Sequence, residues 1–275
     1  MDRDTHLASV EAFAPGLVER MLDAALAIKA KPPVFGIAGL PGSGKSTLAA
    51  QLVQAARARG KIAVALSIDD FYLTRRERQA LGRRVHPLLA TRGPPGTHDV
   101  PLACACIDRL KQMRDGDSVR LPRFDKLGDQ RLPPSRWQKI QRRPDLIVFE
   151  GWFLKVRPES ENALRSPLNS LEQDEDADGR WRRFCNGALA GYAPLWQRLD
   201  RLLLLHAPGF GITRHWRWQQ EQMLQAARPK RRAMNQAQVE RFVMLFERVS
   251  RHALETLPGI ADIDIRLDAH RQEMD

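Results

Sequence analysis

The stretch Gly39-Leu-Pro-Gly-Ser-Gly-Lys-Ser-Thr47 decides how this chain folds, and it follows directly on the apolar run Val34-Phe-Gly-Ile-Ala38. It matches the pattern G-x-x-x-x-G-K-[ST], in which glycines let the backbone wrap around a phosphate chain with its N–H groups turned inward. The apolar run predicts a strand, and residues 47–57 predict a helix whose N-terminal dipole favours an anion. Because a glycine turn without a ligand needs neither flanking element, we expect a nucleoside triphosphate to bind here.

The same loop predicts which residues contact the nucleotide and its metal ion. Lys45 is placed to reach the β- and γ-phosphates, and the Ser46 hydroxyl is placed to coordinate Mg²⁺. ATP and Mg²⁺ are therefore the expected cofactors. The expected nucleotide-binding residues of the loop are Gly39, Leu40, Pro41, Gly42, Ser43, Gly44, Lys45, Ser46 and Thr47.

The composition narrows the class of protein further. The 275 residues suffice for one large α/β domain, and no apolar run is long enough to cross a bilayer. No secretory signal pattern is visible and the three cysteines form no C-x-x-C pair, so we expect a cytoplasmic protein without membrane contact. The net charge is +11, but the basic residues are dispersed and no nucleic-acid recognition signature accompanies them. We expect a small-molecule substrate, and the oligomeric state is left open.

Apolar runs alternate with helical stretches along the chain. Such runs predict a mostly parallel sheet with helices on both faces, and they lie at residues 34–38, 62–68, 145–149 and 202–205. Residues 118–121 and 263–267 are candidates for further strands. We interpret residues 1–275 as a single domain. Residues 1–30 form its helical lead-in, with Val10, Phe13, Leu17, Met21, Ala24 and Ala25 at helical spacing.

Two irregular stretches interrupt this alternation. Residues 82–101 contain Gly93-Pro-Pro-Gly-Thr-His-Asp99, and a loop of this kind is expected at the ligand crevice. Residues 157–180 contain the acidic run Glu172-Gln-Asp-Glu-Asp-Ala-Asp178. From Asp174 to Gly179 the sequence matches the D-x-D-x-D-G pattern that begins a calcium-binding loop. The twelfth position of that loop is Cys185 where a bidentate Glu is required. We therefore expect an insertion that forms a solvated acidic loop.

Two of the apolar runs end in acidic residues. In Ser67-Ile-Asp-Asp-Phe-Tyr72, either Asp69 or Asp70 can accept a proton from a substrate hydroxyl or cap a helix. Neighbouring side chains of an extended chain point to opposite sides, so the two aspartates cannot share one role. Glu150 ends the third run and is a candidate to order Mg²⁺, while Gly151 after it leaves space for a ligand.

These motifs resemble those of small-molecule kinases of the phosphoribulokinase/uridine kinase type and, among them, the D-glycerate 3-kinases. The resemblance rests on GLPGSGKST at 39–47, SIDDFYLT at 67–74, HPLLATRGPPGTHD at 86–99, LPRFDK at 121–126, VFEGWF at 148–153 and NSLEQDEDADGRWRRFCN at 169–186. The block at 86–99 is the most specific, because uridine and pantothenate kinases carry different residues there. The resemblance implies a three-layer P-loop kinase sandwich with a small lid, and ATP-dependent phosphorylation of a hydroxyl of D-glycerate.

The resemblance also implies roles for matched positions. Asp69 is the first acid of a D-x-F-[YH] pattern and takes the place of the general base, which leaves Asp70 a structural residue. Glu150 takes the place of the Mg²⁺-associated acid. The expected catalytic residues are thus Asp69, Lys45 and Glu150, and the expected metal ligands are Ser46 and Glu150.

Further matched positions fall on the acceptor side and on the lid. The positions where such kinases contact the acceptor are Tyr72, His98 and Asp99. The lid corresponds to about residues 209–235 and includes the basic run Arg228-Pro-Lys-Arg-Arg232. Within it, Arg214 and Arg217 are expected to contact ATP.

Glycerate itself sets a physical demand on its site. The most efficient small ligands gain at most roughly 1.5 kcal/mol per heavy atom, so the carboxylate of so small an acceptor must meet a cation or several N–H donors. Arg92 is the first candidate for this contact, and Arg123 and Lys126 are the alternatives.

Other functions remain open at this point. A kinase of the same fold acting on a nucleoside or another small alcohol would use the same motifs. A nucleoside would favour an aromatic-lined base pocket. A P-loop ATPase or GTPase switch fits less well, since no N-K-x-D guanine motif is present and the SIDDFY segment suits an acceptor hydroxyl better than a switch loop. A nucleic-acid-associated ATPase is the remaining alternative.

Overall fold

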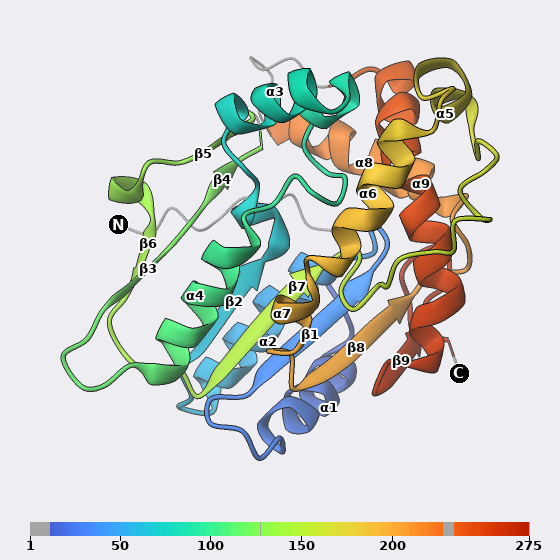
Figure 1. Ribbon diagram of the computed structural model, residues 1–275. Coiled ribbons are helices and arrows are strands. Elements are labelled where there is room, and N and C mark those ends of the chain that lie inside the picture. Colours follow the sequence, from blue (N-terminus) through green and yellow to red (C-terminus); the bar gives the residue numbers. More distant parts are fainter. Residues whose placement is uncertain (1–11, 127, 228–233, 275) are drawn as a thin grey trace.

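Strand β1 (Val34–Gly39), which leads into the phosphate loop, lies in the middle of a five-stranded parallel sheet (Figure 1). This computed structural model describes residues 12–126, 128–227 and 234–274. The strand order is β2-β7-β1-β8-β9, and the other strands are β2 (Ala63–Ser67), β7 (Leu146–Gly151), β8 (Arg201–His206) and β9 (Ile263–Arg266). Strands β1 and β7 are buried along their whole length because both faces of the sheet are covered.

Helices pack on both faces of this sheet (Figure 1). One face carries α1 (Pro15–Leu26) and α2 (Lys45–Ala58), whose apolar side chains form a core with Phe35 and Ile37 of β1. The other face carries α4 (Val100–Gln112), α6 (Arg180–Ala190), α7 (Ala193–Trp196) and α9 (Gln236–Thr256). The remaining α-helices of the described residues are α3 (Arg75–Arg84), α5 (Ser170–Glu175) and α8 (Ile212–Ala227). The predicted three-layer α/β fold is confirmed.

The four predicted strands are all present, and the two further candidates differ in their outcome. Residues 263–267 join the main sheet through β9. The run at 118–121 forms β3 (Val119–Leu121), which pairs antiparallel with β6 (Gln138–Ile140) outside the main sheet. A second short ribbon, the β4–β5 hairpin, joins β4 (Phe124–Asp125) to β5 (Gln130–Arg131). Both ribbons belong to the segment between α4 and β7.

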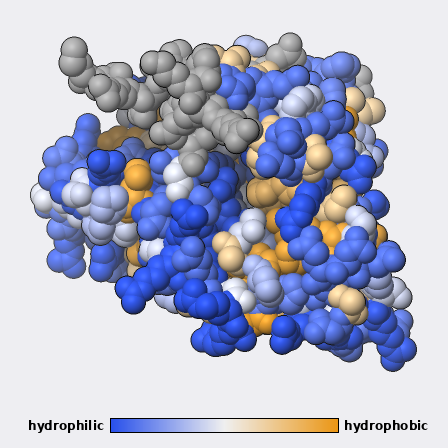
Figure 2. Space-filling view, turned by 90° about the horizontal axis from the view of Figure 1, so that it is seen from above, coloured by the Kyte–Doolittle hydropathy of each residue, from blue (hydrophilic) through white to orange (hydrophobic). Residues whose placement is uncertain are grey.

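The structure bears on three expectations from the sequence: the helical lead-in, the lack of a membrane-spanning segment and the unpaired cysteines. Within residues 1–30, Leu17, Met21 and Ala25 are buried on α1, whereas Val10 lies outside the described residues. Over the described ranges, no helix has the length and apolar character that a membrane crossing requires. The three cysteines are buried free thiols, and the face seen in Figure 2 is largely hydrophilic. That the chain is a single domain stays a prediction.

The acidic stretch is not the solvated loop that its charge predicts. It forms most of α5 and the turn that leads into α6, and the carboxylates of Glu172 and Asp176 are buried. Glu172 accepts hydrogen bonds from Nε and Nη2 of Arg248 on α9 at 2.8 and 2.6 Å, and Asp176 pairs with Arg182 at 3.0 Å. The prediction was wrong because charge density alone does not reveal two buried arginine partners. The stretch instead fastens α5 and α6 to α9.

Replacing Glu172 by Ala should lower the free energy of unfolding by about 3–5 kcal/mol, since it leaves the buried Arg248 guanidinium without its main partner. Urea denaturation measures this. Glu175 is the matched control in the same helix, because its pair with Arg241 is half exposed. Glu175→Ala should cost less than about 1 kcal/mol. Equal losses in the two variants would contradict this account of the acidic stretch.

Candidate active site

The phosphate loop lies at the carboxyl end of β1, where its motif predicts it. Gly42 and Gly44 have φ of +88° and +93°, a conformation that side-chain-bearing residues rarely adopt, and Gly44 is the N-cap of α2. Lys45 is buried at the start of α2, and its Nζ donates a hydrogen bond to the Leu40 carbonyl at 2.8 Å. Burial lowers the pKa of Lys45, while Glu150 and Asp69 act in the opposite direction. The loop thus combines a wrapped backbone with a buried ammonium group.

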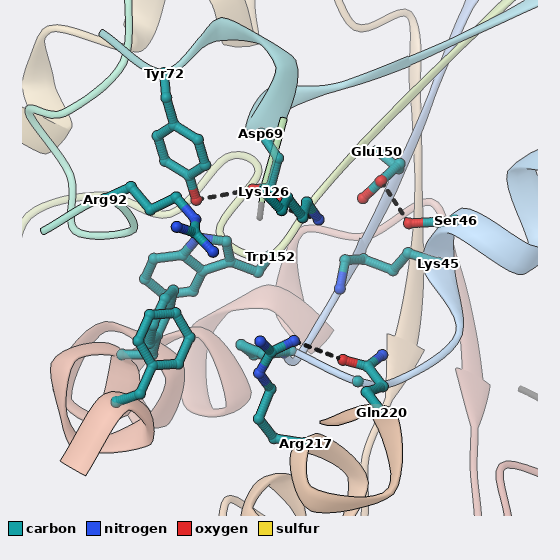
Figure 3. A pocket seen from close by; sticks show the side chains of 14 residues that line it. Lys45, Ser46, Asp69, Tyr72, Arg92, Lys126, Glu150, Trp152, Arg217 and Gln220 are labelled. Atoms are coloured by element: carbon teal, nitrogen blue, oxygen red, sulfur yellow. Dashed lines mark hydrogen bonds and ion pairs between the residues drawn. The ribbon is translucent and has the colours of Figure 1, made fainter. Parts of the chain in front are cut away.

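A cavity opens beside this loop, and predicted side chains reach it from several elements (Figure 3). Lys45 and Arg92 approach it from opposite sides. The predicted site residues that line it are Pro41, Gly42, Lys45, Ser46, Asp69, Tyr72, Arg92, Lys126, Glu150 and Arg217. The fold therefore brings the phosphate loop, both acidic strand ends and part of the acceptor-side set to one place.

The structure separates the two neighbouring aspartates. Asp69 lines the cavity, where its carboxylate accepts a hydrogen bond from the Tyr72 hydroxyl at 2.9 Å and pairs with Nζ of Lys126 at 2.7 Å. Asp70 points elsewhere and accepts hydrogen bonds from Arg123 and from the Phe124 N–H at 2.7 and 3.1 Å. Of the two, only Asp69 faces the cavity, and Asp70 anchors the β4–β5 hairpin.

The surroundings of Asp69 keep it ionised. Burial by itself raises its pKa, but the Lys126 ammonium and the Tyr72 hydroxyl outweigh burial and hold the pKa below its ordinary value. Burial also raises the pKa of Tyr72 well above its usual range, so its hydroxyl stays protonated and donates to Asp69. The site therefore presents a fixed carboxylate with a defined hydrogen-bond partner.

Glu150 and Ser46 form the part of the site that fits a metal ion. Glu150 is the penultimate residue of β7, and its Oε1 accepts a hydrogen bond from the Ser46 hydroxyl at 2.7 Å. The described residues contain no cluster of three or more His, Cys, Asp or Glu side chains that would hold a metal unaided. One carboxylate and one hydroxyl beside a phosphate loop are the kind of oxygen set that holds Mg²⁺ together with substrate phosphates and water.

The glycine after Glu150 has a different role from the predicted one. A Cβ built on Gly151 would lie 2.7 Å from the Leu154 side chain and 2.9 Å from that of Ile68. The missing side chain therefore makes room for the protein's own packing, and the predicted space for a ligand is not found there.

Outside the phosphate loop, four predicted site residues do not line the cavity. Asp99 is the N-cap of α4, where it accepts a hydrogen bond from the Leu102 N–H, and it also pairs with Arg131 at 2.9 Å. The Arg123 guanidinium donates hydrogen bonds to the side chains of Asp70 and Gln138. Each of these two side chains forms its hydrogen bonds within the protein, and its predicted contact with an acceptor stays a prediction.

His98 and Arg214 are the other two predicted site residues outside the phosphate loop that do not line the cavity. His98 lies behind the Tyr72 ring, with ring centroids 4.4 Å apart, and its Nδ1 is 2.7 Å from the Tyr192 hydroxyl. Burial lowers the pKa of His98 to about 3, so the ring is neutral. Arg214 is exposed on α8, whereas Arg217 on the same helix reaches the cavity. The basic run at 228–232 lies outside the described residues.

The cavity also has a side that sequence patterns do not reveal. It is formed by Trp152, Gln220, Phe242 and Phe246. Phe242 and Phe246 are four residues apart on α9 and look like ordinary core positions of an amphipathic helix. The only available signal was the closeness of Trp152 to Glu150 in the VFEGWF motif.

Arg92 is held in place by a chain of charged groups. Its Nη1 donates to Oδ1 of Asp129 at 2.7 Å, and Oδ2 of Asp129 accepts from Nη2 of the fully buried Arg78 at 2.6 Å. Asp129 has a positive φ of 50° in the β4–β5 hairpin. Among the described residues, Asp129 is the only hydrogen-bond partner of Arg92. Two guanidinium groups thus share one carboxylate, and a positive charge is left beside the cavity.

A phosphate loop on a parallel sheet, with acidic residues at two neighbouring strand ends, defines a P-loop phosphotransferase. Residues 34–159 match the model of the phosphoribulokinase/uridine kinase family. The uncharacterized kinase mug58 of Schizosaccharomyces pombe is 34% identical over 205 residues, which cover 71% of this chain and 72% of that protein. This chain belongs to the phosphoribulokinase/uridine kinase family.

Two relatives carry a more specific description. The chloroplastic D-glycerate 3-kinase of Arabidopsis thaliana is 29% identical over 200 residues, which cover 69% of this chain and 41% of that longer protein. The structure of D-glycerate 3-kinase from Cryptococcus neoformans var. grubii superposes with a TM-score of 0.74 at 25% identity, over 94% of this chain and 96% of the other. The protein is a P-loop kinase related to the D-glycerate 3-kinases.

Lys126→Met should move the acid limb of the pH profile of kcat/KM to higher pH. Without the ammonium group, burial dominates and raises the pKa of Asp69, so a larger fraction is protonated at a given acid pH. The expected displacement is roughly one to three pH units. Lys139→Met on the exposed β6 is the control. An unchanged limb in Lys126→Met would show that Lys126 does not set the ionisation of Asp69.

Proposed function

We propose that this protein transfers the γ-phosphoryl group of ATP to a hydroxyl group of D-glycerate. The observation that carries the proposal is the convergence of Lys45, Asp69 and Arg92 on one cavity (Figure 3). These residues provide a cation for the phosphates, a base for a hydroxyl and a cation for a carboxylate. The two relatives described as D-glycerate 3-kinases support the same acceptor.

The nucleotide side uses the phosphate loop. The backbone of residues 39–47 surrounds the phosphates, and the Lys45 ammonium neutralises charge on the β- and γ-phosphates. Mg²⁺, held by Ser46 and Glu150, would stabilise negative charge on the phosphate oxygens. Arg217 reaches the cavity from α8 and adds a cation on the side away from Asp69.

The acceptor side uses Asp69. Its carboxylate accepts the proton of the glycerate hydroxyl while that oxygen forms a bond to the γ-phosphorus. The bond from the γ-phosphorus to the bridging oxygen breaks, and ADP leaves. Because the transition state of phosphoryl transfer is loose, a base of low pKa suffices when it orients the attacking hydroxyl. The Tyr72 hydroxyl holds the Asp69 carboxylate in position for this.

The ring side chains favour a small acceptor over a nucleoside. Trp152 and Phe246 are only 4% and 5% exposed and pack edge to face on each other at 4.9 Å. The Arg217 guanidinium lies over the Phe242 ring, 5.3 Å from its centroid. Trp152 and Phe246 are thus buried against each other, and Arg217 covers one face of Phe242, which supports a small acceptor over a stacked base.

Arg92 is our candidate for the glycerate carboxylate, with Lys126 as the alternative. Arg92 uses one of its N–H groups on Asp129, and the guanidinium faces the cavity (Figure 3). Lys126 already pairs with Asp69. The cytoplasmic location stays a prediction. Product identification in a screen of glycerate, glycerol and uridine as acceptors tests the proposed activity directly.

Asp69→Asn should lower kcat by roughly 10²- to 10⁴-fold with little change in the KM for ATP, because a positioned base is lost while the phosphate loop is untouched. Steady-state kinetics with glycerate measure this. Asp70→Asn should be milder, since Asp70 contacts Arg123 and Phe124 outside the cavity. A larger loss of kcat in Asp70→Asn would reverse the assignment.

Arg92→Lys should lower kcat/KM for glycerate by roughly 10- to 150-fold, because a point charge cannot replace the two-pronged guanidinium contact. Glycerol lacks the carboxylate, so it should be a poor acceptor and lose little further in the variant. Arg131→Lys is the matched control, since Arg131 also pairs with an aspartate but does not line the cavity. Equal losses with glycerate and glycerol would exclude Arg92 as the carboxylate partner.

A further inference from the structure

The C-terminal segment holds the phosphate loop from outside the cavity. After β9 the chain turns back on itself, and Leu267 and Glu273 form an antiparallel bridge. Arg271 lies within this turn, is only 9% exposed, and donates a hydrogen bond from Nε to the carbonyl oxygen of Gly42 at 2.7 Å. These two residues are 229 positions apart in the sequence.

The same arginine also joins the phosphate loop to α8. Its guanidinium lies over the ring of Trp216, 5.0 Å from the centroid, and its Nη1 donates to Gln219 at 3.1 Å. The indole N–H of the fully buried Trp216 donates in turn to the Ala269 carbonyl at 2.8 Å. A Cβ on Gly42 would lie 2.7 Å from the Cβ of Trp216, so the loop and α8 are in close contact. Three separate parts of the chain therefore meet at one point.

This contact constrains the orientation of a peptide group in the loop. In a planar trans peptide, the carbonyl of Gly42 and the N–H of Ser43 point in opposite directions, and that N–H donates to the Leu40 carbonyl at 3.1 Å. A hydrogen bond that draws the Gly42 carbonyl toward Arg271 keeps this partly negative oxygen away from a phosphate in the loop. A reversed peptide would present the oxygen to the anion and weaken binding.

The backbone of Arg271 indicates that the contact is specific. Its φ is +65°, a conformation that costs a residue with a side chain free energy and persists only where surrounding contacts enforce it. The bonds to Gly42 and Gln219 and the stacking on Trp216 are such contacts.

We propose that Arg271 is a positioning residue for nucleotide binding. It keeps the Gly42 carbonyl turned away from the phosphates and, through Trp216, fastens the helix that carries Arg217 into the cavity. The inference concerns the nucleotide side of the site and does not depend on which acceptor the kinase uses.

The test is ADP binding to the full chain, measured by isothermal titration calorimetry in the presence of Mg²⁺ and without an acceptor. Arg271→Gln should weaken ADP binding by about 10-fold, the usual effect of losing one charge-assisted hydrogen bond. Arg271→Lys keeps a cationic donor and should retain part of the affinity. In turnover, the KM for ATP should rise while the KM for the acceptor stays the same.

Glu273→Gln is the matched control, because Glu273 ties the same segment to Arg20 on α1, away from the phosphate loop. It should leave ADP binding unchanged even where thermal unfolding shows lower stability. Wild-type ADP affinity in Arg271→Gln would overturn the proposal. An equal loss of affinity in Glu273→Gln would also overturn it, because general attachment of the segment would then be the cause.

Discussion

A buried ammonium group needs negative charge nearby, and this requirement at Lys45 governs the arrangement of the site. The parallel sheet meets it through the order β2-β7-β1, in which Glu150 is paired in register with Ser67 of β2 and Ile37 of β1. Asp69 follows β2 by two residues, so both carboxylates act on Lys45 from neighbouring strand ends. The strand order therefore decides which carboxylates the phosphate loop meets.

The acceptor side of the site depends on a second structural element, the β4–β5 hairpin. Its Phe124 N–H is held by Asp70, its Lys126 pairs with Asp69, and its Asp129 joins Arg92 to the buried Arg78. A short ribbon of two-residue strands has little stability of its own. These charged contacts attach the hairpin to the site and make the expected base and the expected carboxylate-binding arginine part of one network.

The excess of basic residues also has a structural explanation in part. Arg78, Arg182, Arg248 and Arg271 are buried, and each donates hydrogen bonds to carboxylates or carbonyls within the fold. Arg182 and Arg248 bind the acidic stretch, which explains why that stretch is not a solvated loop. These four arginines thus act inside the protein, where a planar group with five donors satisfies several oxygens at once.

The sequence by itself determined the features that arise from local backbone chemistry. Apolar β-branched runs predict the parallel strands, and the glycines and Lys45 of the loop predict the phosphate site, because these depend on neighbouring residues alone. Tertiary structure decided which side chains meet. Asp69 and Asp70 are adjacent in the sequence, and the fold decides which partners each of them faces. Asp99 also caps a helix, at a position where an acceptor contact was expected. The aromatic wall from α9 and the contact of Arg271 with Gly42 join residues far apart in the chain, and no local pattern encodes such pairs.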